Sequence, residues 1–178
     1  MALDYTRLKI PDLLLIQPKV FSDERGFFIE KYKQSDFDEL GIPLFTQDNY
    51  SYSKQGVIRG LHYQLPPFEQ GKLVSVIKGK VWDVAVDVRK NSKHFGQWVG
   101  VELSEENNLS FYIPSGFAHG FSVLSPEANF LYKCTAEYSP EHESGVRFDD
   151  PHLNIDWKVE KPVVSQKDLK WPSLNTEK

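Results

Sequence analysis

Apolar and polar residues alternate with a period of two along much of this chain, which is the period of a β-strand with two different faces. In the segment 82–88, Trp and Val residues alternate with Asp83, Ala85 and Asp87. The segment 73–77 is apolar except for one serine. Between the two segments, Lys78-Gly79-Lys80 predicts a tight hairpin that joins two neighbouring strands.

Other segments with strand-like composition follow one another along the whole chain. They are 12–20, 26–33, 45–53, 57–64, 97–103, 110–113, 116–124 and 129–137. Turn residues separate them at intervals of about 8–12 residues, a spacing typical of sandwiches and barrels. Short strands in this number predict a mainly β fold, an antiparallel jelly-roll barrel.

Helical patterns are scarce. The segment 35–40 predicts one short helix, with Ser35 as its N-cap and Gly41 at its end. A short turn is expected after Asn91, and another short helix at 165–169. The sequence has no internal repeat or linker, so we expect one domain over residues 1–178.

Composition narrows the class of protein. No run of about 18 apolar residues exists, which predicts no membrane-spanning helix, and the polar segment 1–9 argues against a signal peptide. The single cysteine, Cys134, has no partner for an internal disulfide and favours a cytoplasmic protein. The net charge of −4 argues against nucleic-acid binding but leaves room for a small anionic ligand.

Two short segments carry the candidate chemistry. Arg59 to Gln64 reads Arg-Gly-Leu-His-Tyr-Gln, with Lys72 following soon after, and the other segment places His119 in Pro-x-Gly-x-x-His. A neutral imidazole with an ammonium group nearby can remove a proton next to a carbonyl and stabilise the enolate that forms. Since strand geometry puts His62 and Gln64 on the same face, we expect these polar side chains to line an open cavity rather than a dry core.

A metal site is the main alternative. The spacing around His119 is that of the second cupin motif, in which the histidine often binds a metal ion. His62 and Glu69 partly fit the first motif, but Gln64 stands where a second histidine would be. A glutamine carbonyl is a poor ligand for zinc or iron, so the sequence favours a site without metal.

Three further residues are candidates with competing interpretations. Asp83 and Asp168 could orient the histidines, because a carboxylate on one ring nitrogen fixes the tautomer of a histidine base. On the residues alone, Asp83 could equally face solvent and Asp168 could cap a helix. Tyr132 could simply be a packing residue. Cys134 lies in an apolar strand, where an inert buried thiol is expected.

With these residues assembled, the chain closely resembles the dTDP-4-dehydrorhamnose 3,5-epimerases, a family of the cupin superfamily. The similarity runs from about residue 20 to 172. The segments that carry it are Asp23-x-Arg25-Gly26-x-Phe28-x-Glu30, Gln47-Asp48-Asn49, 56–64, 70–74, 83–89, 112–121, Tyr132-Lys133-Cys134, Gly145, Asp150-Pro151, Ile155-x-Trp157 and Ser165-x-Lys167-Asp168.

The resemblance implies a catalytic set. His62 matches the general base and Asp168 the carboxylate that orients it. Lys72 matches the cation beside the developing enolate, and Tyr132 matches the acid that returns a proton on the opposite face. The family needs no metal or cofactor for this chemistry.

The resemblance also implies a binding set for a 4-keto-6-deoxyhexose carried on thymidine diphosphate. His119 and Asp83 match a second pair in the pocket, and Arg59 and Lys167 match residues near the diphosphate and sugar. The other matching positions are Arg25, Glu30, Gln47, Asp48, Asn49 and Glu143. In the family, some of these reach across from the partner subunit of a homodimer.

Three functions therefore compete. A cofactor-independent 3,5-epimerase of a dTDP-sugar is the best supported, and a relative that inverts only C3 or only C5 shares its scaffold. A metal-dependent cupin enzyme is the second. A cupin that only binds a sugar or nucleotide is the third, and it would have no use for a base, an acid and a cation together.

Overall fold

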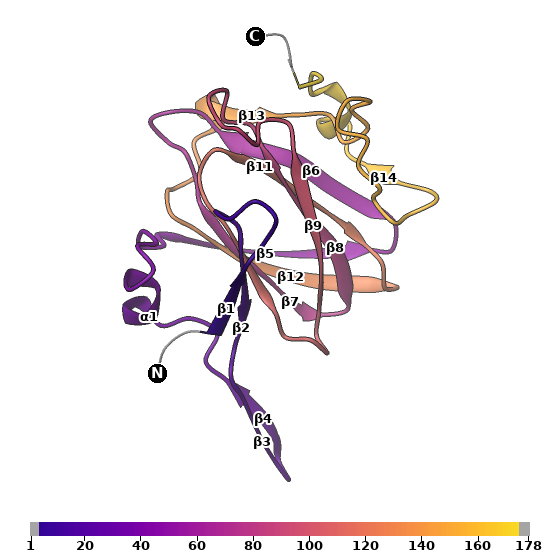
Figure 1. Cartoon of the computed structure of the whole chain (residues 1–178). Helices are drawn as coiled ribbons and strands as arrows, with labels where there is room; N and C mark the ends of the chain where they lie inside the picture. The colour runs from indigo at the N-terminus through magenta and orange to yellow at the C-terminus, as the bar shows by residue number, and fades with distance from the viewer. Residues whose placement is uncertain (1–3, 175–178) are drawn as a thin grey trace.

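The computed structural model describes residues 4–174, which form two antiparallel β-sheets packed face to face (Figure 1). The first sheet consists of β1 (Asp4–Arg7), β2 (Leu14–Gln17), β10 (Ser110–Ile113), β7 (Lys72–Lys78), β12 (Glu127–Cys134) and β5 (Gln47–Lys54), in that order. The second consists of β13 (Glu143–Gly145), β6 (Val57–Gln64), β11 (Phe117–Val123), β8 (Lys80–Asp87) and β9 (Trp98–Ser104), and β14 (Val163–Val164) pairs with β6 in parallel. The predicted mainly β jelly-roll fold is confirmed.

The core lies between the sheets because each strand turns its apolar side inward. The first sheet contributes side chains such as Val74 and Phe130, and the second contributes Val81 and Phe121. All four are less than 5% exposed. Burying a side chain of this size contributes roughly 1.5–3 kcal/mol.

Both outer faces are partly covered by chain outside the sheets. Phe37 and Ile42, in and after α1 (Gln34–Asp38), pack on Leu14 and Leu73 of the first sheet. On the second sheet, Leu153, Trp157 and Leu174 of the C-terminal segment pack on the outward side chains of β8 and β6. The C-terminal segment therefore lies along the second sheet (Figure 1).

The predicted hairpin at Gly79 is wrong. β7 pairs with β10 and β12, whereas β8 pairs with β11 and β9, so the chain crosses from the first sheet to the second at this glycine. Gly79 has a φ of +81°, and a Cβ there would lie 2.0 Å from the carbonyl oxygen of Glu127. The glycine therefore makes a corner between sheets rather than a turn within one.

The strand predictions held better than the helix predictions. Segments 57–64 and 110–113 match β6 and β10 to the residue, and the expected turns follow Asn91. Ser35 is not the N-cap of α1: the cap is Lys33, which makes no capping hydrogen bond with its side chain. The helix expected at 165–169 is the 3₁₀ turn η2 (Asp168–Lys170), and the other short turn, η1 (Pro140–His142), was not predicted.

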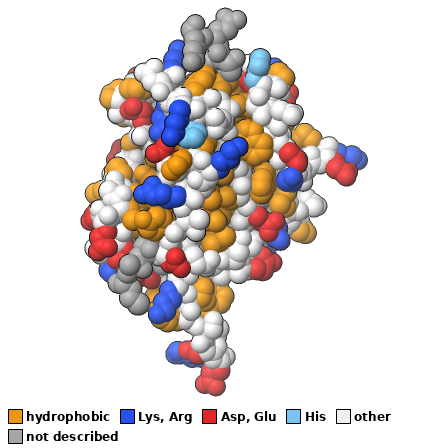
Figure 2. Space-filling view, viewed as in Figure 1, with side chains coloured by type: hydrophobic (Ala, Val, Ile, Leu, Met, Phe, Trp, Pro, Cys, Tyr) orange, Lys and Arg blue, Asp and Glu red, His pale blue; other side chains and the backbone are white. Residues whose placement is uncertain are grey.

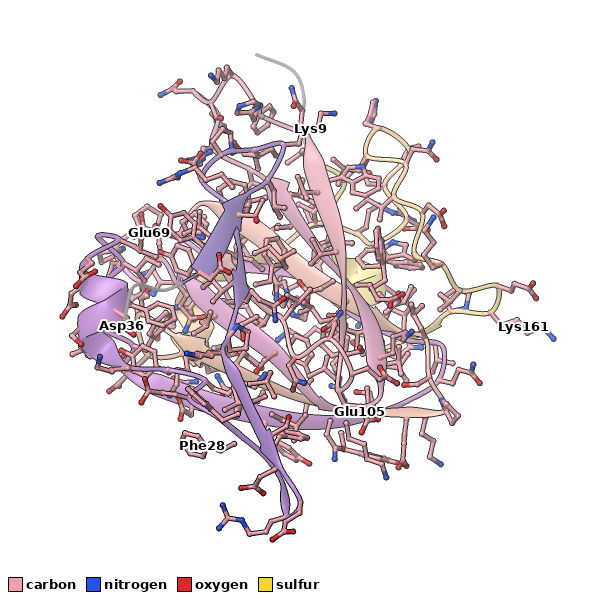
Figure 3. The ribbon with its side chains drawn as sticks, turned by 60° about the horizontal axis from the view of Figure 1, so that its bottom comes forward. Lys9, Phe28, Asp36, Glu69, Glu105 and Lys161 are labelled. Carbon is pink, nitrogen blue, oxygen red and sulfur yellow. The ribbon has the colours of Figure 1, made fainter. Side chains whose placement is uncertain are left out.

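A short hairpin projects from the body of the molecule. It consists of β3 (Val20–Asp23) and β4 (Gly26–Ile29), which pair only with each other. Phe27 and Phe28 are each more than 60% exposed on it. Figures 2 and 3 show the hairpin standing clear of the sheets, with charged side chains at its tip.

Residues 1–3 and 175–178 lie outside the described part, so the single-domain prediction over 1–178 stays a prediction. Within residues 4–174, no helix is long and apolar enough to cross a membrane.

A β-bulge between β6 and β11 determines which side chains face the interior. The register pairs His62 with His119 and Arg59 with Phe121, so β6 has one more residue than β11 between these two pairs. An extra residue breaks the alternation of side chains. Arg59 and His62, which strict alternation would place on opposite faces, consequently both face the interior.

The bulge requires two glycines. A Cβ on Gly60 would lie 2.5 Å from the Cα of Gly120, and a Cβ on Gly120 would lie 2.7 Å from the carbonyl oxygen of Arg59. Both distances are shorter than the van der Waals contact distance of a Cβ atom. The glycines of Arg-Gly-Leu-His and His-Gly-Phe are therefore explained by this close approach of two strands.

We expect Gly120→Ala to lower the free energy of unfolding by about 1–3 kcal/mol, the usual cost of overpacking, because the added methyl group meets backbone atoms that cannot move aside. Gly41→Ala is the matched control, since Gly41 has a φ of +69° but open space around its Cβ position. Urea denaturation of both variants measures the difference. A smaller loss for Gly120→Ala than for Gly41→Ala would contradict the close-approach explanation.

Candidate active site

Two cavities open between the sheets and meet at three side chains. The larger has a volume of about 420 Å³ and the smaller about 290 Å³. His62, Lys72 and Tyr132 line both of them. These three residues, each predicted to be catalytic, therefore lie at the junction of one two-lobed cleft.

His62 is held by a carboxylate from the C-terminal segment. Its Nε2–H donates to Oδ1 of Asp168 at 2.6 Å. The amide N–H of Asp168 in turn donates to the hydroxyl of Ser165 at 3.0 Å. With Nε2 engaged, Nδ1 is the ring nitrogen left free to accept a proton, and no bond to it occurs within residues 4–174.

Asp168 is set up to stay ionised. Burial by itself would raise the pKa of Asp168, but the hydrogen bond and charge of His62, together with bonds from Gly60 and Ser165, bring that pKa below its ordinary value. An ionised carboxylate on one ring nitrogen fixes the tautomer and the orientation of the imidazole. The sequence alternative of a helix-capping aspartate is not what the structure shows, because the Asp168 carboxylate bonds to His62.

Lys72 brings a buried ammonium group to the cleft. It begins β7 in the first sheet, and its Nζ donates to the carbonyl oxygen of His62 in the second sheet at 3.3 Å. Burial lowers the pKa of Lys72, an effect partly offset by Cys134, Asp83 and Glu143. The lysine is poised to meet a negative charge that forms in the cleft.

Tyr132 faces His62 across the cleft. It lies on β12 of the first sheet, opposite Val74 of β7 and Asn49 of β5, whereas His62 lies on β6 of the second sheet. Burial raises the pKa of Tyr132, so its phenol holds a proton at neutral pH. A proton acceptor and a proton donor therefore stand on opposite walls.

His119 and Asp83 form a second, fully buried pair behind this junction. Nε2 of His119 lies 3.0 Å from each carboxylate oxygen of Asp83. Burial raises the pKa of Asp83 and lowers the pKa of His119. The alternative that Asp83 faces solvent is wrong: it is 0% exposed and lies behind His119, which lines the larger lobe.

Two cations stand on the rim of the larger lobe. Arg59 donates from Nε to the hydroxyl of Ser53 at 3.0 Å and from Nη2 to the carbonyl oxygen of Tyr52 at 3.3 Å. Lys167 donates to Oε2 of Glu143 at 2.5 Å. Both cations could receive an anionic group at the mouth of the cleft.

The remaining candidates divide into two groups. Gln47, Asn49 and Glu143 line the smaller lobe, and Gln47 donates to Asn49 at 3.0 Å. Asp48 points to the opposite face of β5, where Lys133 donates to it at 2.8 Å.

Arg25 and Glu30 lie on or beside the projecting hairpin, away from the cleft of their own chain. Arg25 is bonded to Asp23 in the same turn, and neither Arg25 nor Glu30 lines either lobe. A role for them in ligand binding stays a prediction, as it does for Asp48.

Sequence reasoning missed three residues of the site. Ser51 follows Gln47 and Asn49 at the same two-residue spacing on β5, so the strand period could have placed it in the cleft. Tyr138 lines the smaller lobe and donates its hydroxyl to Glu143 at 2.7 Å. Ser165 lies three residues before Asp168, a spacing at which a hydroxyl often bonds a backbone N–H.

Among the positions of the cupin metal motifs, His62 and His119 line the cleft, but Gln64 is held by other hydrogen bonds and Glu69 lies outside the cleft. Gln64 donates to the carbonyl oxygens of Phe68 and Glu137 and accepts from the amide of Ser139, so its amide holds two loops together. Glu69 lines neither lobe. Among residues 4–174 there is no group of three His, Cys, Asp or Glu side chains arranged to hold a metal ion. Cys134 is buried, and burial raises the pKa of its thiol, as expected for an inert cysteine.

The arrangement can move protons on a bound carbonyl compound. An oriented imidazole can take a proton from one side, an ammonium group can stabilise the negative charge, and a phenol can return a proton from the other side. An anionic tail on the ligand would meet Arg59 and Lys167.

Comparison with known proteins shows the family to which this chain is similar. The family model described as dTDP-4-dehydrorhamnose 3,5-epimerase matches residues 7–176. A dTDP-4-dehydrorhamnose 3,5-epimerase from Shigella flexneri is 54% identical over 165 residues, covering 92% of this chain and 91% of the relative.

Solved structures of epimerases that act on dTDP-sugars are also similar to this chain. A dTDP-6-deoxy-D-glucose-3,5-epimerase from Legionella pneumophila, in complex with dTDP-4-keto-L-rhamnose, has a TM-score of 0.94 and 51% identity, covering 99% of this chain and 95% of that one. A 3′-monoepimerase from Streptomyces bikiniensis, in complex with dTDP-quinovose, has a TM-score of 0.88 and 33% identity, covering 95% and 87%.

We expect the Lys72 ammonium to lose its proton at a lower pH than an exposed lysine, because burial lowers its pKa. An NMR pH titration of protein labelled with ¹³C-lysine measures this, and Lys72→Met identifies the resonance by removing it. Lys78, on the solvent-facing end of the same strand, is the internal comparison, and its pKa is raised by its bond to Glu127. Titration of Lys72 at or above Lys78 would contradict the electrostatics described here.

Proposed function

Because this chain belongs to the dTDP-4-dehydrorhamnose 3,5-epimerase family, we propose that it is an isomerase that converts dTDP-4-dehydro-6-deoxy-D-glucose to dTDP-4-dehydro-L-rhamnose. The observation that carries the proposal is the meeting of His62, Lys72 and Tyr132 at the junction of the two lobes. The reaction serves the synthesis of dTDP-L-rhamnose.

His62 removes the proton in the first step. The hydrogens on C3 and C5 of the sugar both neighbour the C4 ketone, which makes them acidic enough to transfer. Asp168 holds the imidazole by Nε2, so Nδ1 accepts the proton. The electron pair of the broken C–H bond moves toward the ketone and gives an enolate with its negative charge on the C4 oxygen.

Lys72 stabilises that enolate. Its buried ammonium lies in a region of low dielectric, where an interaction with a new oxyanion is much stronger than in water. Placing the cation there in advance avoids reorganisation during the reaction. Preorganised charge stabilisation of this kind is usually the largest single contribution to catalysis.

Tyr132 completes the inversion. Its phenol donates a proton to the carbon from the face opposite His62, because the two residues come from opposite sheets. Burial raises the pKa of Tyr132 and keeps it protonated until then. His62 then releases its proton to water and Tyr132 regains one from water, which restores both residues for the next inversion. The net change is a transfer of protons alone, so the proposed reaction needs no redox cofactor and no metal.

The nucleotide is held at the rim of the cleft. Arg59 and Lys167 are suited to the diphosphate and the adjoining sugar, and His119 contacts the substrate with Asp83 behind it. Gln47, Asn49 and Glu143 supply polar contacts from the smaller lobe. We also propose that the protein works in the cytoplasm, which its free, buried cysteine suits.

The protein acts as a homodimer in this proposal. The hairpin β3–β4 carries Arg25 in its turn, outside the cleft of its own chain, and exposes Phe27 and Phe28. Figure 3 shows Phe28 on this hairpin. A hairpin of this kind is suited to reach a second copy and bring Arg25 and Glu30 to that copy's nucleotide.

Proton NMR of the dTDP-4-keto-6-deoxyglucose substrate in D₂O, with enzyme treated with chelator, tests the reaction. We expect deuterium at both C3 and C5. His62→Ala should lower the rate of exchange by about 10²–10⁴-fold, because the general base is lost. Tyr132→Phe should lower turnover to product while His62 still catalyses some exchange.

Each other outcome has a definite meaning. Exchange at one carbon only would identify a monofunctional epimerase, the activity named for the Streptomyces bikiniensis relative. Exchange that depends on added metal would favour the metal-dependent alternative. Near-complete activity in His62→Ala would contradict the assignment of the base.

Mixing two inactive variants tests the dimer. Arg25→Ala should bind substrate poorly and His62→Ala should lack the base. When equal amounts are unfolded and refolded together, about a quarter of wild-type turnover should return, because half of the dimers are mixed and one of their two sites is intact. No recovery in mixed dimers would show that Arg25 serves the site of its own chain or none.

A further inference from the structure

The indole of Trp171 lies beside His62, in the space left by a glycine on the neighbouring strand β13. Gly145 of β13 pairs directly with His62 of β6, so its side chain would stand next to the imidazole on the same face. A Cβ on Gly145 would lie 2.5 Å from Cδ2 of Trp171 and 2.6 Å from its Cε2. The indole therefore occupies the cross-strand position that the glycine vacates.

The indole contacts the imidazole as well as the glycine. The rings of His62 and Trp171 are 6.3 Å apart between centroids and tilted by 66°, an edge-to-face arrangement. Trp171 Nε1 is buried and has no hydrogen-bond partner within the described residues. The indole is thus placed by packing rather than by a hydrogen bond.

Trp171 also ends the turn that carries Asp168. The turn η2 spans Asp168–Lys170, and Trp171 follows it directly. The next residue, Pro172, accepts a hydrogen bond from the amide of Arg147 at 2.9 Å. The side chain of Trp171 therefore packs against His62 at the point where the segment that carries Asp168 returns to the second sheet.

We propose that Trp171 is a positioning residue that holds the His62 ring and the Asp168 carboxylate in register with each other. This inference rests on the proposed function, in which His62 is the base. The 2.6 Å bond between His62 and Asp168 joins two segments that are 106 residues apart. The pairing of β14 with β6 and the bond from the amide of Gly60 to Asp168 hold the backbone and the carboxylate in place, but neither of them touches the imidazole ring. The indole supplies the packing against that ring without itself lining either lobe.

The variants separate this role from general stability. Trp171→Ala and Trp171→Leu remove the aromatic side chain, and Trp171→Phe keeps one aromatic ring while removing the pyrrole part of the indole with its unpaired N–H. Leu174→Ala is the matched control, because Leu174 anchors the same tail in the apolar cluster on the outer face of the second sheet, whereas His62 faces the cleft. Thermal unfolding of all four shows how much each loosens the tail.

The first readout needs no substrate. The proton shared by His62 and Asp168 should give a low-field ¹H NMR resonance, which Asp168→Asn identifies by abolishing it. We expect the resonance to be lost in Trp171→Ala and Trp171→Leu, and kept in Trp171→Phe and Leu174→Ala. Its persistence in both Trp171→Leu and Trp171→Ala would overturn the proposal, as would its equal loss in Leu174→Ala.

The second readout is kinetic. Trp171→Leu should lower kcat by about tenfold with little change in KM, because a misplaced base slows proton transfer without weakening nucleotide binding. Trp171→Phe should restore most of kcat. A rise in KM alone would overturn the positioning role. If the wild-type protein did not turn over the dTDP-sugar, the proposed function would fail while the NMR result still decided the role of Trp171.

Discussion

The close approach of β6 and β11 at Gly60 and Gly120 is the constraint on which the site depends. The extra residue of β6 at this point turns both Arg59 and His62 toward the interior, and the two glycines make room for it. Without the bulge, one of these side chains would lie on the outer face, among the apolar residues that cover the second sheet. The position of the base relative to the rim cation is therefore a property of the backbone.

Burying a polar group in an apolar interior costs free energy unless the group has a hydrogen-bond partner. The buried polar side chains of the cleft accordingly have partners. His119 is satisfied by Asp83, His62 by Asp168, and the ammonium of Lys72 by a backbone carbonyl. The same burial moves the pKa values of Lys72 and Tyr132 in opposite directions, lowering the first and raising the second. In both cases burial favours the neutral form, so the phenol keeps its proton and the ammonium of Lys72 is less stable than it would be in water.

The sequence predicted strands well where their period was regular and their ends were marked by turn residues, as at 57–64 and 110–113. It failed at Gly79, because a glycine with positive φ serves a hairpin and a corner between sheets equally well, and local pattern does not say which sheet a strand joins. The bulge between β6 and β11 could not be predicted for a related reason. Alternation of apolar and polar residues is the signal for a strand, and a bulge interrupts that alternation.

Site residues were predictable to different degrees. His62, Lys72 and His119 stood out by residue type and local context, and the structure brings them together. Asp168 was assigned to His62 only by family resemblance, because no local signal links residues so far apart in the chain. Ser51 could have been found from the period of β5. The proposed contribution of Arg25 and Glu30 rests on the family resemblance, because neither side chain lines the cleft of its own chain.

The long span between His62 and Asp168 has a consequence for synthesis of the protein. A nascent chain that has left the ribosome as far as β12 already contains His62, Lys72 and Tyr132, but the carboxylate that orients the base comes later. The residues that cover the outer face of the second sheet also come later. The bond between His62 and Asp168 can therefore form only after the C-terminal segment has been made, and a chain stalled before that point would carry His62, Lys72 and Tyr132 without this carboxylate.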